Sequence, residues 1–477
     1  MNIESPKLLP KKQDFSKWYN RVLFLADIID KRYDVKGCFV WKSYGYEIML
    51  KIKEIWDNLF KKNGIKEMYF PLLVPLKYAK KNKSWWEGFK DQAYYVIAGE
   101  KEKYILRPTG EPAMYPMFSL WIRSYKDLPL KIYETVSSFR YETKHTRPLI
   151  RDREITVWHE IHCAFATKEE ADKEVELHRK IYDDLWSELC MEPLSVIKPS
   201  WELFPGAVGA IEYYSYFPEL GKVMENGSIN NLGQAYSKKF GIKFKDKDGK
   251  EKYVWQVCTG NGARLLVAVI AIHGDDFGLV LPPSIAPIQV VIVPISKKEN
   301  WNIVLEKAKE IDKNLKKYGI KSFVDDRQDI TPGEKFYEHE LKGIPIRIEI
   351  GEKEISGKYL TIFKRNTREK KIINNEKEIK NILLEIKKEM QEKARNIINN
   401  AIIFEKNKEN IMKHIINKKI VKVYYCGDGN CFDAIKDLGK QEIGIEVFGT
   451  DLKKYKEGNC IICDKKTNQI GYIASTI

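Results

Sequence analysis

The stretch VSSFRYETKHTRPLIRDRE, residues 136–154, decides the fold because it has the form of a charged β-hairpin. It carries four arginines, three acidic residues and one histidine behind a strand-like segment, residues 131–136. In a β-strand, residues two apart point to the same face, so Arg140 and Glu142 should lie side by side. A polar loop then leads to Arg151, which enters a second β-rich run. The sequence therefore predicts a hairpin whose two strands bring arginines together.

Two interpretations of this hairpin are open. The planar fork of Arg140 matches phosphate oxygens bidentately, and Arg151 can add charge from the second strand, which would make the hairpin a polyphosphate grip. The alternative is a solvated charged hairpin without a ligand. The remaining chain has to decide between them.

Composition favours a folded protein with a polyanionic partner. A length of 477 residues and 43% hydrophobic residues predict two to four domains with real cores. The net charge of +15 suits nucleic acid, although the abundance of lysine can also reflect biased composition. No run of about 18 apolar residues occurs, which argues against a membrane-spanning protein. The polar N-terminus lacks a secretory apolar region, so a cytosolic location is expected.

Four of the eight cysteines cluster near the end of the chain. Cys426 and Cys431 form one pair, and Cys460 and Cys463 form a second. Two thiolate pairs at these spacings are typical of a tetrahedral structural zinc, and a closed four-sulfur site leaves no position for catalysis. The alternative is a set of four reduced cysteines without metal.

Residues 1–286 read as an α+β domain built on a mostly antiparallel sheet with helices on one side. The apolar run 68–75 reads as a strand that Pro71 places at an edge or bulge. Pro112 should open a helix, since proline is tolerated in the first turn. Other predicted helices span residues 14–26, 45–63, 168–189 and 265–273, and strands dominate residues 203–256.

Three prolines between residues 281 and 287 predict a domain boundary. Residues 287–372 then alternate strands and helices, which indicates an α/β domain. Residues 373–477 would form the C-terminal domain, with a long charged helix over residues 376–416 ahead of the four cysteines. In this α/β domain, strands are predicted at 288–293, 322–324, 346–350 and 358–363, and helices at 301–318 and after the Pro332-Gly333 turn.

These motifs resemble those of the class II aminoacyl-tRNA synthetases. Phe139-Arg140-Tyr141-Glu142 with Arg151 resembles motif 2, the helix before Pro71 resembles motif 1, and Gly260-x-Gly262-x-Arg264 resembles motif 3. The chain is more closely similar to the prolyl enzymes of the archaeal and eukaryotic type, over nearly its whole length. That similarity rests on Arg107-Pro108-Thr109-x-Glu111, the run from Arg140 to Pro148, Leu232-Gly233-Gln234, His273-Gly274-Asp275, the run from Gly278 to Pro283, and Pro332-Gly333-x-Lys335-Phe336.

The resemblance implies activation of proline by ATP and its transfer to tRNA. Arg140 would be the catalytic cation that holds the α-phosphate and the substrate carboxylate, and Glu225 is a candidate magnesium ligand. The α/β domain would bind the anticodon, with Glu340 and Arg347 as candidates that could instead form a surface ion pair. Motif 1 implies a homodimer. The implied ATP-binding residues are Arg140, Glu142, Arg151, Glu225, Ser228, Gly262 and Arg264, and the implied amino-acid-binding residues are Phe89, Thr109, Glu111, Arg140, Trp158, His162 and Asn230.

Several residues depart from the family pattern, which usually has Gln at 225, Thr at 228, His at 230 and Ser or Thr at 262. Here these positions hold Glu225, Ser228, Asn230 and Gly262, and Gly110 replaces a serine. Two alternatives to a prolyl enzyme therefore stay open. One is a related synthetase that adenylates another small amino acid or acylates an acceptor other than tRNA. The other is a non-catalytic RNA-binding regulator.

Overall fold

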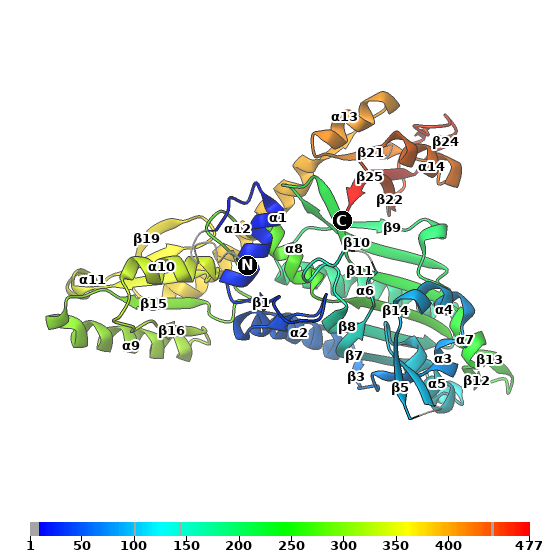
Figure 1. Ribbon diagram of the computed structural model, residues 1–477, viewed down its shortest axis with the longest axis horizontal. Coiled ribbons are helices and arrows are strands. Elements are labelled where there is room, and N and C mark those ends of the chain that lie inside the picture. Colours follow the sequence, from blue (N-terminus) through cyan, green and yellow to red (C-terminus); the bar gives the residue numbers. More distant parts are fainter. Residues whose placement is uncertain (1–8, 100–101, 144, 440–442) are drawn as a thin grey trace.

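The computed structural model describes residues 9–99, 102–143, 145–439 and 443–477, so Lys144 in the loop of the hairpin lies outside them (Figure 1). One large sheet runs through the catalytic and C-terminal regions, and a second sheet builds the α/β domain. In Figure 1 the α/β domain lies at one end of the molecule and the small helices and strands around α5 and α7 lie at the other.

Within the described residues, the large sheet has 11 strands in the order β20-β21-β25-β22-β9-β10-β11-β14-β8-β7-β3. The predicted hairpin is confirmed, because β7 and β8 pair antiparallel from Leu130↔Ala164 to Phe139↔Glu154. The catalytic strands are β3 (Lys66–Glu67), β7 (Leu130–Phe139), β8 (Glu154–Phe165), β9 (Leu194–Ile197), β10 (Gly209–Phe217), β11 (Lys222–Gly233) and β14 (Trp255–Asn261).

Helices cover both faces of this sheet, so the expectation of helices on one side is wrong. Neighbouring strand residues Ile132 and Tyr133 are both fully buried but belong to two different cores. A sheet that is apolar on both faces has to be covered on both. One core involves α1 (Phe15–Leu25), α2 (Ser43–Lys62), α6 (Lys168–Glu188) and α8 (Arg264–His273); the other involves α3 (Leu76–Ala79), α4 (Lys83–Phe89), α5 (Glu111–Trp121) and α7 (Ala235–Phe240).

The apolar run 68–75 forms less strand than predicted, because only β4 (Leu73–Pro75) is extended and paired. Pro71 lies before this strand, where its missing N–H disturbs no ladder. Strand β4 belongs to a small sheet with β5 (Tyr94–Ala98) and β6 (Glu102–Leu106), in the order β4-β6-β5. Short paired segments elsewhere are β1 (Ile29–Asp30), β2 (Val40–Trp41), β12 (Lys243–Lys245) and β13 (Glu251–Tyr253).

The α/β domain has five strands in the order β16-β15-β17-β18-β19 within the described residues. Strand β15 pairs parallel with both β16 and β17, as alternating strands and helices predict. Ile379 and Ile386 of α12 (Ile379–Ala401) pack into the same core. The elements are β15 (Val290–Pro294), α9 (Trp301–Lys317), β16 (Ser322–Val324), α10 (Pro332–Leu341), β17 (Ile346–Ile350), α11 (Glu352–Gly357), β18 (Leu360–Lys364) and β19 (Glu369–Ile373).

The single long helix predicted over residues 376–416 is wrong. Helix α12 ends at Ala401, because the following apolar residues form the edge strand β20 (Ile402–Phe404), and helix resumes only at α13 (Ile411–Ile416). Strand β25 (Ile470–Thr476) joins this C-terminal region to the catalytic sheet by pairing in parallel with β11. The remaining C-terminal elements are β21 (Ile420–Tyr424), α14 (Gly429–Leu438), β22 (Glu446–Asp451), β23 (Gly458–Asn459) and β24 (Lys466–Thr467). No helix among the described residues is long and apolar enough to cross a membrane.

Candidate active site

Two adjoining cavities open on the face of the large sheet that α5 and α7 cover. Their shared wall is formed by Arg140, Trp158, Glu225 and Gly260. The first, about 80 Å³, is called here the arginine cavity, and the second, about 330 Å³, the carboxylate cavity. The arginine cavity is lined by Arg140, Glu142, Leu149, Ile150, Arg151, Asp152, Ile155, Trp158, Glu225, Asn226, Gly227, Gly260, Asn261, Gly262, Ala263 and Arg264. The carboxylate cavity is lined by Phe89, Thr109, Glu111, Arg140, Trp158, Glu160, His162, Glu202, Leu203, Phe204, Pro205, Glu212, Glu225, Ser228, Asn230, Cys258, Thr259 and Gly260.

The cavities bring together every residue that the sequence suggested for ATP and for the amino acid. Of the suggested ATP-binding residues, all but Ser228 line the arginine cavity. All the suggested amino-acid-binding residues, and Ser228, line the carboxylate cavity. Arg140 was suggested for both roles and lines both cavities.

Arg140 lies directly after β7, where the strand delivers it to the shared wall. Its Nε donates to the carbonyl oxygen of Pro108 at 3.2 Å, and its guanidinium lies 5.1 Å from the ring centre of Trp158 and 5.7 Å from that of Phe89. Desolvation and the nearby charge of Arg264 lower the pKa of Arg140, but a guanidinium remains charged in proteins. The wall therefore holds a fixed cation whose terminal N–H groups make no hydrogen bond to the residues that the structure describes.

A second cation, Arg264, opens α8 and closes the far side of the arginine cavity. Its Nε donates to the carbonyl oxygen of Ile150 at 2.9 Å. One terminal nitrogen donates to the backbone carbonyl of Glu225 at 3.2 Å and to its carboxylate at 3.3 Å. Arg264 thus ties the hairpin loop to β11 and fixes the direction of the Glu225 carboxylate.

Gly260 and Gly262 let β14 approach the indole of Trp158. A Cβ atom at Gly260 would lie 2.8 Å from Cζ2 of Trp158. At Gly262 it would lie 3.2 Å from both Cε3 of Trp158 and Cγ2 of Ile155. The paired glycines therefore leave the indole its place in the shared wall.

Thr109 and Glu111 form the polar end of the carboxylate cavity at the start of α5. The Thr109 hydroxyl donates to the Glu111 carboxylate, and Trp85 Nε1 donates to the same two side chains at 3.2 and 3.3 Å. Burial raises the pKa of Glu111, and the charge of nearby Glu160 adds to this. A cationic ligand group would offset this unfavourable burial.

Glu160 is a site residue that sequence reasoning missed. One carboxylate oxygen accepts from the backbone N–H of Gly110 at 2.7 Å and lies 3.3 Å from Nε2 of His162, while the other oxygen is buried without a hydrogen bond in the described structure. His162 Nδ1 in turn lies 2.9 Å from the hydroxyl of Tyr115. Burial alone would lower the pKa of His162, but the carboxylates of Glu160 and Glu111 raise it.

Gly110 leaves room for that contact. A Cβ atom at position 110 would lie 2.8 Å from Cε of Met114 and 2.9 Å from the Glu160 carboxylate. The glycine that departs from the family pattern is therefore matched to the position of Glu160. Asn230, another departure, is buried and donates to the hydroxyl of Ser228 at 3.0 Å.

A fully buried ion pair joins Arg107 to Glu134, whose charged atoms lie 2.5 Å apart. Burial raises the pKa of Glu134 to about 7, against the opposing effect of Arg107. Glu134 also accepts from the backbone N–H of Phe70 at 3.1 Å. The pair joins the residue that follows β6, two positions before Thr109, to β7.

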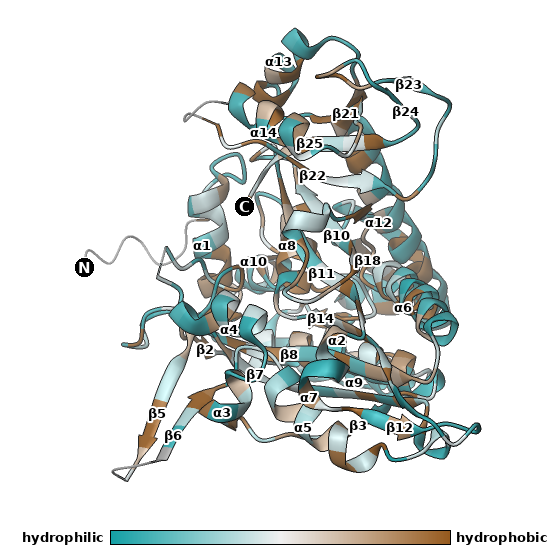
Figure 2. Ribbon diagram, turned by 90° about the vertical axis from the view of Figure 1, so that its right-hand side faces the viewer, coloured by the Kyte–Doolittle hydropathy of each residue, from teal (hydrophilic) through white to brown (hydrophobic). Residues whose placement is uncertain are grey.

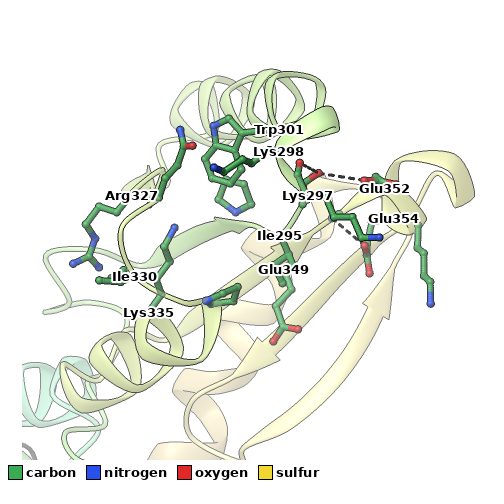
Figure 3. Close-up of a pocket in the computed structure, with 16 residues that line it drawn as sticks. Ile295, Lys297, Lys298, Trp301, Arg327, Ile330, Lys335, Glu349, Glu352 and Glu354 are labelled. Carbon is green, nitrogen blue, oxygen red and sulfur yellow. Dashed lines mark hydrogen bonds between the residues drawn. The ribbon is translucent and has the colours of Figure 1, made fainter.

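A separate cavity of about 680 Å³ lies in the α/β domain at the carboxyl ends of β15, β16 and β17 (Figure 3). Open α/β sheets bind ligands at this edge. Trp301 and Lys298 lie on one side in the close-up, Lys335 lies 5.8 Å from the ring centre of Trp301, and the guanidinium of Arg327 points away from the opening, where it pairs with Asp325 and Glu338.

The anticodon candidates lie in the same domain but point into a packed network. Arg347 lies 3.0 Å from Glu340 and 2.9 Å from Glu349, and its guanidinium lies 3.8 Å from the ring centre of Phe336. Arg347 is only 4% exposed, so the ion pair is buried and not at the surface. Glu349 connects this network to the cavity of Figure 3.

The four clustered cysteines fit a metal ion. All four are free thiols whose sulfurs lie within 4.8 Å of one another. Cys426 Sγ lies 3.6 Å from that of Cys431 and 3.8 Å from that of Cys463. Four sulfurs placed about 2.3 Å from a tetrahedral zinc lie about 3.8 Å apart, so the spacing matches.

Comparisons with known proteins agree across the chain. Residues 94–273 match the tRNA synthetase class II core domain (G, H, P, S and T), residues 289–389 an anticodon binding domain, and residues 408–476 the C-terminal domain of prolyl-tRNA synthetase.

Similar full-length proteins include the proline–tRNA ligases of Thermoplasma volcanium and Methanopyrus kandleri. The first is 40% identical over 95% of this chain and 97% of its own length, and the second is 39% identical over 97% and 96%. A solved structure of Giardia lamblia prolyl-tRNA synthetase in complex with prolyl-adenylate superimposes with a TM-score of 0.94 at 33% identity, covering 99% of this chain and all of that chain.

Proposed function

The chain belongs to the class II prolyl-tRNA synthetases, and from this premise we propose that it activates proline with ATP and transfers the prolyl group to tRNA. The observation that carries the proposal is the shared wall between the two cavities. A reaction that joins a nucleotide α-phosphate to an amino-acid carboxylate needs two subsites meeting at one cation, and Arg140 lies where the subsites meet.

Activation is an in-line attack of the proline carboxylate on the α-phosphate, which releases pyrophosphate and forms prolyl-adenylate. Both reacting groups are anions, so catalysis requires positioning and fixed positive charge more than a proton acceptor. Arg140 holds the carboxylate and the α-phosphate together and stabilises the negative charge of the transition state. Its bond to the carbonyl of Pro108 and its ring contacts keep the guanidinium in place between reactants.

ATP binds at the arginine cavity, whose volume of about 80 Å³ holds only part of the nucleotide, so the rest lies outside it. Glu142 accepts from the adenine amino group, Arg264 lies over the adenine face, and Arg151 meets the outer phosphates. Glu225 would hold a magnesium ion, which offsets phosphate charge when bound. A carboxylate oxygen is a suitable magnesium ligand, although the Glu225 carboxylate also pairs with Arg264 at 3.3 Å. Ser228 contributes a hydroxyl beside it.

Proline occupies the carboxylate cavity. Thr109 and Glu111 receive its ammonium group, which supplies the positive charge that the buried carboxylate lacks. The ring lies among the side chains of Phe89, Trp158 and His162, with Asn230 at the wall. The terminal ribose of tRNA then attacks the adenylate carbonyl and releases AMP.

The α/β domain binds the anticodon of tRNA. The cavity of Figure 3 offers Trp301 for base stacking and the exposed Lys297 and Lys298 for phosphates, which are contacts that single-stranded RNA uses. Glu340 and Arg347 support this cavity through Glu349.

Cys426, Cys431, Cys460 and Cys463 hold one structural zinc ion, which ties α14 to the β23–β24 segment. The enzyme works as a homodimer in the cytosol. For the dimer, the support is the resemblance of α2 to motif 1, together with the exposed side chains of Tyr46 and Leu50 on that helix.

The experiment is aminoacylation of tRNA. The purified protein with ATP, magnesium and a tRNA mixture should attach proline, detected by mass spectrometry of the released amino acid, and the charged tRNAs should carry proline anticodons. Attachment of a different amino acid, or adenylate formation without any charged tRNA, would contradict the proposal.

A further inference from the structure

We propose that a continuous basic surface beside the carboxylate cavity, here called the α3–α7 basic surface, binds the acceptor end of tRNA. It comprises the segments 76–83, 123–127 and 235–253. This inference rests on the proposed function, because tRNA is taken as the polyanion. Its cations are Lys77, Lys80, Lys81, Lys83, Arg123, Lys126, Lys238, Lys239, Lys243, Lys245, Lys247, Lys250 and Lys252, all of them exposed.

The surface concentrates the positive charge of the chain. These three segments contain thirteen lysine and arginine residues and four acidic residues, in a protein whose net charge is +15. Ordinary lysine-rich composition would spread charges of both signs more evenly. Such a concentration raises the local potential and attracts a polyanion, at the cost of repulsion in its absence.

The acidic residues in the surface are already engaged. Lys252 lies 2.5 Å from Asp246 and 3.3 Å from Asp248, and Lys243 lies 3.4 Å from Glu251. The other lysines of the surface have no ion-pair partner among the residues that the structure describes. They are Lys77, Lys80, Lys81, Lys83, Lys126, Lys238, Lys239, Lys245, Lys247 and Lys250.

Contacts between the segments make the surface continuous. Lys81 Nζ reaches the carbonyl oxygen of Phe240 at the end of α7 at 3.5 Å. The backbone N–H of Lys245 in β12 donates to the carbonyl of Arg123 at 2.8 Å, and Lys247 lies over the ring of Tyr125. Figure 1 places α3, α5, α7 and β12 together at the end of the molecule away from the α/β domain.

The surface leads directly into the site of transfer. Helix α4 begins at Lys83 and ends at Phe89, and Phe89 lines the carboxylate cavity. Trp85 of the same helix donates to Thr109 and Glu111 inside the cavity. A nucleic acid strand whose phosphates lie along Lys80 and Lys83 would therefore bring its end to the wall of this cavity.

The position of the α3–α7 basic surface favours the acceptor end of tRNA over the anticodon arm as its ligand. The anticodon cavity lies in the α/β domain at the opposite end of Figure 1, and tRNA is an elongated molecule whose two functional ends are far apart. Lysine side chains contact phosphates without reading bases, so this surface contributes affinity and not the choice of tRNA.

The test compares two sets of neutral substitutions. The surface variant carries Lys80→Gln, Lys83→Gln, Lys238→Gln and Lys239→Gln. The control variant carries Lys173→Gln and Lys180→Gln on α6, which are exposed, lack ion-pair partners among the described residues, and lie on the helix that covers the other face of the sheet.

In the surface variant, the KM for tRNA should rise about tenfold. Each lost phosphate contact lowers the steepness of log affinity against log salt by about 0.7 to 0.9, so the loss of four contacts should lower it by about 3. Proline-dependent exchange of pyrophosphate into ATP needs no tRNA and should be unchanged in both variants. An RNA minihelix that contains only the acceptor stem and 3′ end should bind the wild type and the control but bind the surface variant weakly.

As a second measurement on the unaltered protein, bound tRNA should protect the four surface lysines from acylation and leave Lys173 and Lys180 reactive. Unchanged KM, salt slope and minihelix binding in a variant with normal exchange would overturn the proposal. Loss of binding to full tRNA with normal minihelix binding would also overturn it. Absence of exchange in the wild type would instead contradict the proposed function.

Discussion

Replacing Arg140 tests the role of the shared wall, because two substitutions separate its charge from its shape. Arg140→Lys keeps a cation but loses the planar fork that can hold two oxygens at once. We expect it to lose about one charge-assisted hydrogen bond, about 1.5 to 3 kcal/mol, which lowers kcat/KM about 10- to 100-fold.

Arg140→Ala removes the cation that both reactants share. Loss of one donor to a developing oxyanion typically lowers the rate about 100- to 1,000-fold. Loss of a group that contacts two anions should lower it on the order of 1,000- to 10,000-fold. Stability should change little. Within the described structure the guanidinium makes one hydrogen bond, to Pro108, and removing a desolvated charge offsets the loss of its ring contacts.

The assay is amino-acid-dependent exchange of pyrophosphate into ATP, with separate titrations of ATP and proline, and a thermal melt of each variant. We expect kcat to fall in both variants while the melting temperature stays within a few degrees of the wild type. Exchange by Arg140→Ala within about tenfold of the wild type would refute the assigned role, as would an equal loss in Arg140→Lys and Arg140→Ala.

Three further substitutions probe the site walls and the metal. Gly260→Ala places a methyl group 2.8 Å from Trp158, and such overpacking costs about 1 to 3 kcal/mol. Exchange should therefore fall at least tenfold while the circular dichroism stays native. Normal exchange would show that the indole has room to move. Burial raises the pKa of Asp152, so folding favours its neutral form and the wild type loses stability as pH rises above the unfolded value near 3.8. Asp152→Asn should therefore gain in melting temperature relative to the wild type as the pH is raised above that value, and a relative loss would contradict this. Elemental analysis should find one zinc ion per wild-type chain and none in Cys431→Ser. Equal zinc content in the two proteins, or no zinc in the wild type, would contradict the structural zinc site.

Local pattern was enough to predict the hairpin. The strand alternation expected for Arg140 and Glu142 is wrong, because β7 ends at Phe139 and the N–H of Glu142 donates to the carbonyl of Arg140 at 2.8 Å, although both residues line the arginine cavity. The beginnings of the helices at Pro112 and Arg264 could be predicted for the same reason, since capping and proline preferences act over a few residues. The proximity of Arg264 to this hairpin came from resemblance to a family, because no local rule connects residues 114 positions apart.

Long-range packing explains what was missed. Glu160 lies in an ordinary strand and becomes a site residue only because Gly110, 50 residues earlier, donates to it. Glu202 and Phe204 line the carboxylate cavity from a loop without any motif. No signal in the sequence pointed to these three residues.

The helix predicted over residues 376–416 failed for a similar reason. Its helical periodicity is real up to Ala401, but Ile402 to Phe404 pair with β21, and that pairing depends on a sheet assembled from distant strands. The same sheet continues through β25 into β11, so the cysteine-bearing region is attached to the strand that carries Glu225. Propensity alone does not reveal such a connection.

The most direct test of the central claim is an exchange assay with the wild-type protein and each of the twenty amino acids. If Arg140 joins an ATP cavity to a proline cavity, radiolabelled pyrophosphate should enter ATP in the presence of proline and only weakly with the other amino acids. A stronger signal with another amino acid, or no signal above background with proline, would contradict the account.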